Sequence, residues 1–165
     1  MIRLIATPES RSAAELRRFL QRARRPGREE RRKVADAVAR GIGENFSAQR
    51  AGDGPPWQEL SEWTVLERLL LGYPGRRPIL RRSGELRASY VQANHPEHVE
   101  EHETTGDGWA MEVGSRDIRA GVHEFGHKTK LNTVIPARPA MLLSRRARSR
   151  IGETLDYILD EMAPG

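Results

Sequence analysis

The stretch EERRKVADAVARGIGENF, residues 29–46, sets the frame of the fold. Its apolar side chains Val34, Val38, Ile42 and Phe46 recur every four residues, and charged side chains fill many of the positions between them. A four-residue repeat keeps side chains on one face of an α-helix, so the stretch predicts an amphipathic helix with one buried stripe. The glycines at 41 and 43 weaken helix propensity in its second half.

Another helix is predicted on the N-terminal side of this stretch. Ser12 is a suitable N-cap, and apolar residues three or four apart follow it as far as the stop at Pro26–Gly27. These apolar residues are Leu16, Phe19, Leu20 and Ala23. Residues 1–6 predict a short strand or an extended arm before the Pro8 turn. Residues 1–50 are therefore expected to form a mainly helical part.

On the C-terminal side, the AGDGPP segment at residues 51–56 interrupts the helical pattern. Two Gly and two Pro within six residues cannot continue a helix, so this segment predicts a loop that leads into Trp57. A further helix is then predicted, and the GYPGRRP segment at residues 72–78 ends it. Its expected apolar residues are Leu60, Trp63, Leu66, Leu70 and Leu71.

The middle of the chain carries the pattern of a small antiparallel sheet. Residues 79–90 predict a loop and a short helix around Leu86, and residues 90–103 alternate as a polar strand. A turn at 105–108 leads to a second strand at 109–114. In that strand Trp109, Met111 and Val113 share one face, which predicts that they are buried together.

The last part of the chain predicts a short helix over residues 118–126, an extended connector over 135–139 and a closing helix. Ser144 is expected to cap this closing helix. Its apolar stripe consists of Ile151, Leu155, Ile158, Leu159 and Met162. The predicted class is α+β, with a small antiparallel sheet flanked by N-terminal helices and a C-terminal helix. A length of 165 residues fits a single domain, 1–165, whose basic helical part is 1–50.

Composition narrows the class of protein. Hydrophobic residues make up 37% of the chain and charged residues 31%, so a subunit that buries surface against neighbours is favoured over a self-sufficient monomer. Cysteine is absent, which excludes disulfides, thiolate metal sites and a cysteine nucleophile. The start MIRLIATPES lacks the apolar run of a signal peptide, and no apolar stretch is long enough to span a bilayer. We therefore expect a soluble protein made in the cytoplasm, without a membrane partner.

Charge is distributed unevenly along the chain. The net charge is +5, and residues 1–50 carry thirteen Lys or Arg against six Asp or Glu. Residues 95–107 instead carry five carboxylates and no Lys or Arg. Three interpretations stay open at this point: a basic surface that binds DNA, a subunit whose basic flank meets the acidic flank of its neighbour, and ordinary solvated faces. The DNA-binding interpretation rests on charge alone, since no helix-turn-helix or zinc signature accompanies it.

The HEFGH segment matches the H-E-x-x-H motif of zinc hydrolases. In that motif two imidazoles one helical turn apart, here those of His123 and His127, bind the metal. The carboxylate between them, here that of Glu124, acts as general base. A zinc metalloprotease that uses these residues is therefore the alternative function for this chain.

Two features of the sequence weigh against this zinc interpretation. A third protein ligand is needed, yet no His or Cys follows residue 127, so a carboxylate such as Glu153 or Asp156 would have to serve. Gly126 lies inside the motif and favours an ordinary helix end there. No metal or other cofactor is therefore expected, and the favoured prediction is that the chain is not an enzyme.

A second group of histidines lies among carboxylates in the predicted polar strand. It comprises His95, His98 and His102 together with Glu97, Glu100, Glu101 and Glu103. An extended chain places His98, Glu100 and His102 on one face, where they could bind a metal, but polar alternation in a solvated hairpin explains the same residues. No phosphate-binding glycine loop and no G-x-S-x-G elbow is present. Pro136 and Pro139 are spaced as in a polyproline ligand, although a stiff connector is the preferred interpretation.

Four segments, taken in order and with their spacing, resemble the phage virion-morphogenesis family, which includes the tail-completion proteins of contractile-tailed phages. They are PWQELSEWT (56–64), ILRRSGELRAS (79–89), HEFG (123–126) and IPARP (135–139), and the resemblance extends over 57–162. The matching positions are Trp57, Leu60, Thr64, Gly84, Leu86, His123, Phe125, Gly126, Pro136, Arg138 and Pro139. The chain departs from the pattern at Arg119, where an aromatic residue is usual, and at Ala140, where Phe is common.

The resemblance implies a structural protein that completes or terminates the tail and joins it to the head. Such a subunit is expected to form a homo-oligomeric ring at the neck, a hexamer by analogy with the family. Its expected partners are further copies of itself, tail-tube or sheath proteins, neck or connector proteins and, without base readout, DNA in the lumen. Its place is the tail or neck of the virion, which is assembled in the host cytoplasm. The family implies no metal or catalytic residue in the HEFG turn.

Overall fold

The computed structural model of the chain describes residues 26–105, 108–130 and 132–162. The strand and helix expected within residues 1–23 therefore lie outside the described residues. The described elements are α2 (Arg28–Ala48), α3 (Glu62–Leu70), α4 (Glu85–Val91), β1 (His98–Thr105), β2 (Gly108–Ser115), α5 (Ile118–Phe125), β3 (His127–Lys128), β4 (Val134–Ile135) and α6 (Arg145–Glu161). Together they confirm the predicted α+β class.

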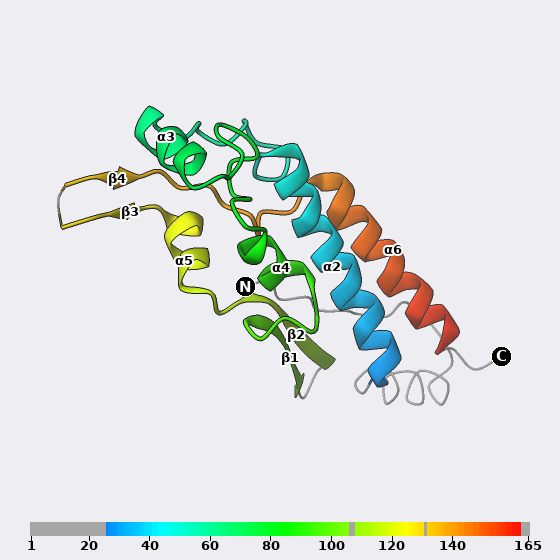
Figure 1. Cartoon of the computed structure of the whole chain (residues 1–165). Coiled ribbons are helices and arrows are strands. Elements are labelled where there is room, and N and C mark those ends of the chain that lie inside the picture. The colour runs from blue at the N-terminus through cyan, green and yellow to red at the C-terminus, as the bar shows by residue number, and fades with distance from the viewer. Residues whose placement is uncertain (1–25, 106–107, 131, 163–165) are drawn as a thin grey trace.

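Helix α2 is the central element, and α6 lies antiparallel against it (Figure 1). The predicted stripe of α2 is buried along its whole length, from Val34 at 0% exposure to Phe46 at 1%. Gly41 lets the two helices approach closely, because a Cβ atom added there would lie 2.8 Å from Leu143 Cδ2 and 3.0 Å from Ala147 Cβ. The glycine that lowers helix propensity thus serves the packing of α2 against α6.

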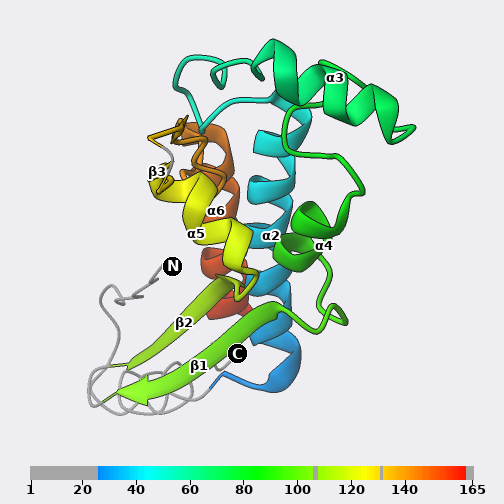
Figure 2. The ribbon, with the colours of Figure 1, turned by 60° about the vertical axis from the view of Figure 1, so that its left-hand side comes forward.

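Helix α4 and the β1–β2 hairpin pack against α2 and complete the core (Figure 2). The strands are antiparallel, with Glu100 opposite Val113 and Glu103 opposite Ala110. Trp109, Met111 and Val113 are all buried, which confirms the prediction for the second strand.

The first strand was predicted to begin at residue 90, and this is wrong: β1 begins at His98. Tyr90 belongs instead to α4, where its ring packs 5.8 Å from that of Phe46. Trp57 also packs against the Phe46 ring, in an edge-to-face arrangement with 5.7 Å between centroids. The short helix predicted around Leu86 is confirmed as α4, and the contacts of this aromatic cluster hold Tyr90 in that helix and not in the strand.

The prediction for α3 is correct in type but wrong in its start. The helix begins at Glu62, after Ser61, whose side chain accepts a hydrogen bond from the Thr64 N–H at 3.3 Å. Leu60 lies before the helix and packs partly buried against the core. Figures 1 and 2 show α3 at the end of the molecule opposite the β1–β2 hairpin. Arg68 attaches it to the following segment through the carbonyls of Pro78 and Ile79.

The C-terminal half contains one element that the sequence did not indicate. Strands β3 and β4 form a second small hairpin, in which His127 pairs with Ile135 and Lys128 with Val134. Helix α6 is capped by Ser144, as predicted, through the Ala147 N–H at 3.1 Å. No helix among the described residues combines the length and apolar character needed to cross a membrane.

Candidate functional site

Two of the sequence motifs are tied together by hydrogen bonds at the base of α3. The Trp57 Nε1–H group donates to the Pro139 carbonyl at 3.2 Å. In return, the Arg138 guanidinium donates from Nε to the Gln58 carbonyl at 2.8 Å and from Nη2 to the Glu59 carbonyl at 3.0 Å. The PWQEL and IPARP motifs are therefore two sides of one junction, although some eighty residues separate them in the chain.

The HEFG motif is tied to the same junction. The backbone N–H of Arg138 donates to the His123 carbonyl at 2.6 Å. Gly126 follows with a φ of +74°, and a Cβ atom added there would lie 3.0 Å from the Ile135 carbonyl oxygen and 3.1 Å from the Ala137 nitrogen. Only glycine fits both this backbone conformation and this close approach. The motif thus turns the chain from α5 into the second hairpin.

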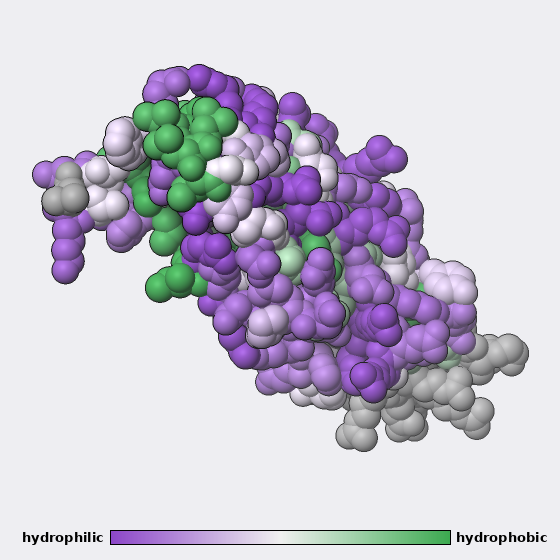
Figure 3. Space-filling model, viewed as in Figure 1, coloured by the Kyte–Doolittle hydropathy of each residue, from purple (hydrophilic) through white to green (hydrophobic). Residues whose placement is uncertain are grey.

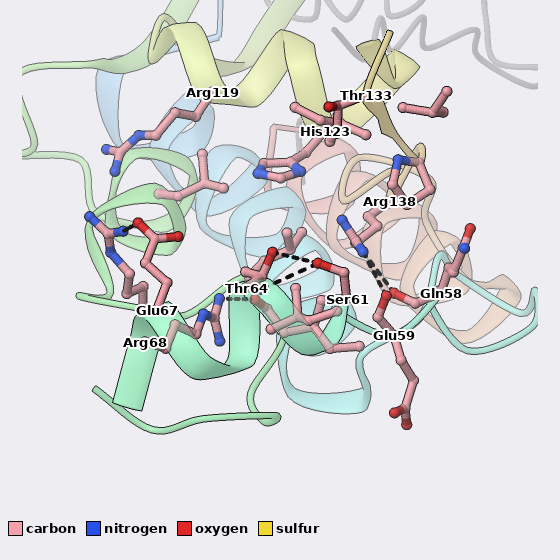
Figure 4. Close-up of a pocket in the computed structure, with 18 of the residues that line it drawn as sticks. Gln58, Glu59, Ser61, Thr64, Glu67, Arg68, Arg119, His123, Thr133 and Arg138 are labelled. Atoms are coloured by element: carbon pink, nitrogen blue, oxygen red, sulfur yellow. Dashed lines mark hydrogen bonds and ion pairs between the residues drawn. The ribbon is translucent and has the colours of Figure 1, made fainter. Parts of the chain in front are cut away.

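A cleft of about 660 Å³ opens between α3, α5 and β4 at this junction (Figure 4). Most of the positions that carry the family resemblance line it. They are Leu60, Thr64, Gly84, Leu86, His123, Pro136 and Arg138. The structure therefore brings all four motifs to one cleft, and this cleft is the candidate site.

Two buried guanidinium groups distinguish this cleft from an ordinary surface groove. Arg68 is 6% exposed and Arg138 is 4% exposed, yet neither forms an ion pair within the described part of the chain. Arg68 donates to the carbonyls of Pro78, at 2.9 Å, and Ile79. Burial lowers the pKa of both arginines, and the nearby Arg68 cation lowers the pKa of Arg138 further. Both remain charged at neutral pH.

His123 projects from α5 into the cleft (Figure 4) and is kept neutral there. Burial, together with the positive charges of Arg138 and Arg119, lowers its pKa from 6.5 to about 4. Its Nδ1 atom is buried and has no hydrogen-bond partner among the described residues. The imidazole therefore contributes polarity, but no charge, at neutral pH.

The zinc-binding interpretation of HEFGH is wrong in its geometry. Helix α5 ends at Phe125, and His127 lies beyond the Gly126 turn in strand β3, so the two imidazoles are not one turn apart on a helix. The Glu124 carboxylate accepts hydrogen bonds from the backbone N–H groups of Ala140, at 2.9 Å, and Met141, at 3.3 Å.

No third ligand joins these two histidines. Within residues 26–105, 108–130 and 132–162, no three His, Asp or Glu side chains gather closely enough to hold a metal ion. Neither Glu153 nor Asp156 of α6 therefore completes a site with His123 and His127, and the motif marks the end of a helix instead.

The other histidine group is also dispersed. His98 places Nδ1 3.1 Å from the Ser89 carbonyl, and His95 places Nε2 3.2 Å from the Glu85 carboxylate. These contacts attach the start of the β1–β2 hairpin to α4. The solvated-hairpin interpretation accounts for the remaining carboxylates, since Glu100, Glu101 and Glu103 are exposed.

Asn45 was missed by the sequence analysis, although it holds the segment that follows the IPARP motif. Its side-chain amide donates to the carbonyls of Ala140, at 2.7 Å, and Leu142, at 2.9 Å, and its oxygen accepts from the Gly52 N–H at 3.0 Å. Asn45 is buried in α2, one position before Phe46. The only signal of this role in the sequence is that a polar residue stands directly beside the apolar stripe of the helix.

The remaining motif residues have local roles or none that the fold explains. Gly84 is the N-cap residue that precedes α4, with a φ of +95°, a conformation that favours glycine, and Leu86 is buried in the first turn of that helix. Phe125 differs from the others, because its side chain is 84% exposed and lies outside the cleft. Nothing in the structure of the single chain explains why an aromatic residue stands there.

The sequence also matches a family model, which accounts for the four motifs. Residues 12–160 match the model of the phage virion morphogenesis family. The chain belongs to that family. No curated protein and no solved structure matched it. As a member of the phage virion morphogenesis family, it is a virion-associated protein with a role in phage assembly.

Proposed function

We propose that the chain is a structural subunit that completes or terminates the phage tail and joins the tail to the head, as one member of a ring at the neck. Family membership gives the general role in phage assembly. The motif residues support a structural role, because Trp57, Arg138 and Gly126 serve to join backbone segments. Function on this view lies in the outer surfaces.

The exposed apolar side of α3 is the observation that carries this proposal. Trp63 is 75% exposed and Leu70 is 78% exposed. Leu66, Leu69 and Leu71 beside them are also exposed. Figure 3 shows the apolar patch that they form over α3. Contiguous apolar patches on soluble proteins commonly mark contacts with other proteins, so we assign this surface to an adjoining component of the particle.

We propose the ring from the family resemblance and from the uneven charge of the chain, which is basic over residues 1–50 and acidic over residues 95–107. A cyclic ring uses heterologous contacts, in which one flank of each subunit meets the opposite flank of the next. A hexamer, contacts with tail-tube, sheath, neck or connector proteins, and a place in the tail or neck of a virion assembled in the host cytoplasm all belong to this proposal. The basic residues of the chain give DNA passing through the lumen a non-specific contact.

A phage that lacks this gene tests the proposed function. Complementation with the natural chain should restore infectious particles, whereas without it electron microscopy should show filled heads and separate tails. The Trp63→Ser/Leu70→Ser variant should fold normally and fail to complement. Ile118→Ser, which removes a similarly exposed apolar side chain from α5, is the matched control. Normal joined particles in the absence of the chain would refute the proposal.

A further inference from the structure

The cleft holds two buried arginines, Arg68 and Arg138, that pair with no carboxylate among the described residues. Two other arginines at its wall are paired: Arg119 with Asp117, and Arg82 with Glu67 at 3.9 Å. Arg68 and Arg138 donate only to backbone carbonyls, and the Nη1 group of Arg138 has no hydrogen-bond acceptor among the described residues.

Such buried cations favour an anionic ligand. A buried charge without a counter-charge is costly, and an anion placed beside it removes part of that cost. The unpartnered Arg68 Nε and His123 Nδ1 atoms lie in the same region and leave further polar groups unsatisfied. Thr64 and Thr133 line the cleft with hydroxyl groups that can also bind an anion.

A carboxylate suits this cleft better than a run of phosphates does. Glu59 and Glu67 also line the cleft, so a polyphosphate backbone would bring like charges together. A single carboxylate side chain brings one negative charge to the cleft and therefore meets less of this repulsion. The ligand that fits is therefore an acidic protein segment, presented as separate side chains.

The β1–β2 hairpin of the same chain carries such a segment at the other end of the molecule (Figure 2). Glu100 and Glu103 of β1 are exposed and form no ion pair in the part of the chain that the structure describes, whereas Glu101 is paired with Arg116. Strand β1 pairs only with β2 among the described strands, so one of its edges is open. Because the hairpin extends away from α3 (Figure 2), we expect its free glutamates to reach the cleft of a different copy and not that of their own chain.

We propose that the cleft between α3 and α5 binds the free glutamates of the β1–β2 hairpin of a second copy of this chain. This contact is heterologous, since one end of each copy is inserted into the opposite end of the next, and it closes into a ring when the rotation per copy allows. The inference rests on the proposed ring and deepens it by naming the two surfaces that meet. It also assigns a role to the motif residues that line the cleft.

Charge-swap variants of the full-length chain test this contact in solution. Glu100→Lys/Glu103→Lys reverses the hairpin charges, and Thr133→Glu places a carboxylate at the exposed cleft wall. Each should weaken self-association by tenfold or more, as measured by sedimentation or mass photometry over a concentration series. The combined triple variant should recover part of the lost association, because lysines then face the new glutamate. Misfolding cannot produce that recovery.

Matched controls separate charge from bulk. Thr133→Lys adds a side chain of similar size with the opposite charge and should leave association intact or tighter. Glu100→Gln/Glu103→Gln removes the charges without reversal and should cause a smaller loss. Association of the natural chain should also weaken as salt is raised.

Three results would overturn the inference. The first is a Glu100→Lys/Glu103→Lys variant that associates like the natural chain, and the second is a natural chain that stays monomeric at tens of micromolar. The third is a cleft that binds a short DNA duplex, with binding lost in Thr133→Glu and association unchanged. If the natural chain and the variants form rings equally well, the proposed contact is wrong but the proposed ring is not. The proposed function is judged separately, by heads and tails that remain unjoined without the chain.

Discussion

Helices α2 and α3 have nearly the same sequence pattern, but the apolar side of α2 is buried and that of α3 is exposed. In α2, Val38 and Ile42 are buried at 1% and 0% exposure among α4, α6 and β2. In α3, Leu66 and Leu70 have the same four-residue spacing, yet both are exposed. Periodicity therefore specifies which side of a helix is apolar, but not whether that side meets its own chain or another one.

The difference follows from what surrounds each helix in the chain. Helix α2 lies between elements that bring their own apolar faces to it, with Gly41 allowing α6 to approach. Helix α3 lies between two loops rich in glycine and proline and is attached through Ser61, Arg68 and the junction below it. Its outer side has no partner within the described residues. In an assembly protein such a side is expected to be covered by a neighbour.

The largest expected effect is on the buried side of this comparison. Ile42→Ala removes an apolar side chain that is completely buried in α2, and cavities of this kind cost about 2–5 kcal/mol. The free energy of unfolding, measured by urea denaturation, should fall by that amount. A loss below about 1 kcal/mol would mean that α2 is not the centre of the core.

The junction between the two regions should be the next most sensitive part. Gly126→Ala places a Cβ atom against the Ile135 carbonyl in a backbone conformation, φ 74° and ψ 166°, that is nearly exclusive to glycine, which should cost roughly 1–3 kcal/mol. Gly84→Ala is the control, because it shares the positive φ but meets nothing within 4 Å. Equal losses in both variants would show that the positive φ alone, and not the close approach to β4, explains Gly126.

The pH dependence of the unfolding free energy should report the burial of His123 at the same junction. Its pKa is lowered to about 4 in the folded chain, against 6.5 when unfolded, so folding favours the neutral form. This contribution is complete above pH 6.5, falls as the pH drops towards 4 and is of order 1–2 kcal/mol after allowance for partial solvation. His123→Gln cannot titrate, so its unfolding free energy should change less between pH 7 and 5. Identical slopes for both proteins would contradict the buried, neutral imidazole.

The smallest expected effect on stability is on the exposed side of the comparison. Leu70→Ala in α3 removes as much apolar volume as a typical core truncation but should change the free energy of unfolding by less than about 0.5 kcal/mol. Thermal and urea unfolding alongside Ile42→Ala provide the measurement. A loss of 2 kcal/mol or more would mean that Leu70 is buried within the free chain, and α3 would then need no partner.

The elements predicted most accurately from the sequence are those whose partners lie in the same chain. The stripe of α2, the buried face of β2 and the Ser144 cap of α6 all depend on short-range patterns that the fold completes. The hairpin of β3 and β4 was missed because strands of two residues have no periodicity to detect. The start of β1 was wrong because Tyr90 is held in a helix by contacts with Phe46 that are distant in sequence.

The candidate site was predicted only in part, for similar reasons. The four motifs named many of the residues that line the cleft, but not that they line one cleft. Arg68 resembles any solvated cation on a helix, and only its carbonyl partners at Pro78 and Ile79 reveal that it is buried. Glu124 looked like a catalytic base because a short motif does not encode the backbone N–H groups that its carboxylate meets.

On the proposed function, the exposed side of α3 is covered by another protein in the particle. Hydroxyl-radical footprinting of Trp63 and Leu70, in the free subunit and in purified virions, measures this directly. Trp57, at 5% exposure, is the internal control for a residue that is protected in both states. We predict strong modification of Trp63 and Leu70 in the free subunit and protection in virions. Equal modification in both states would mean that α3 stays uncovered in the particle.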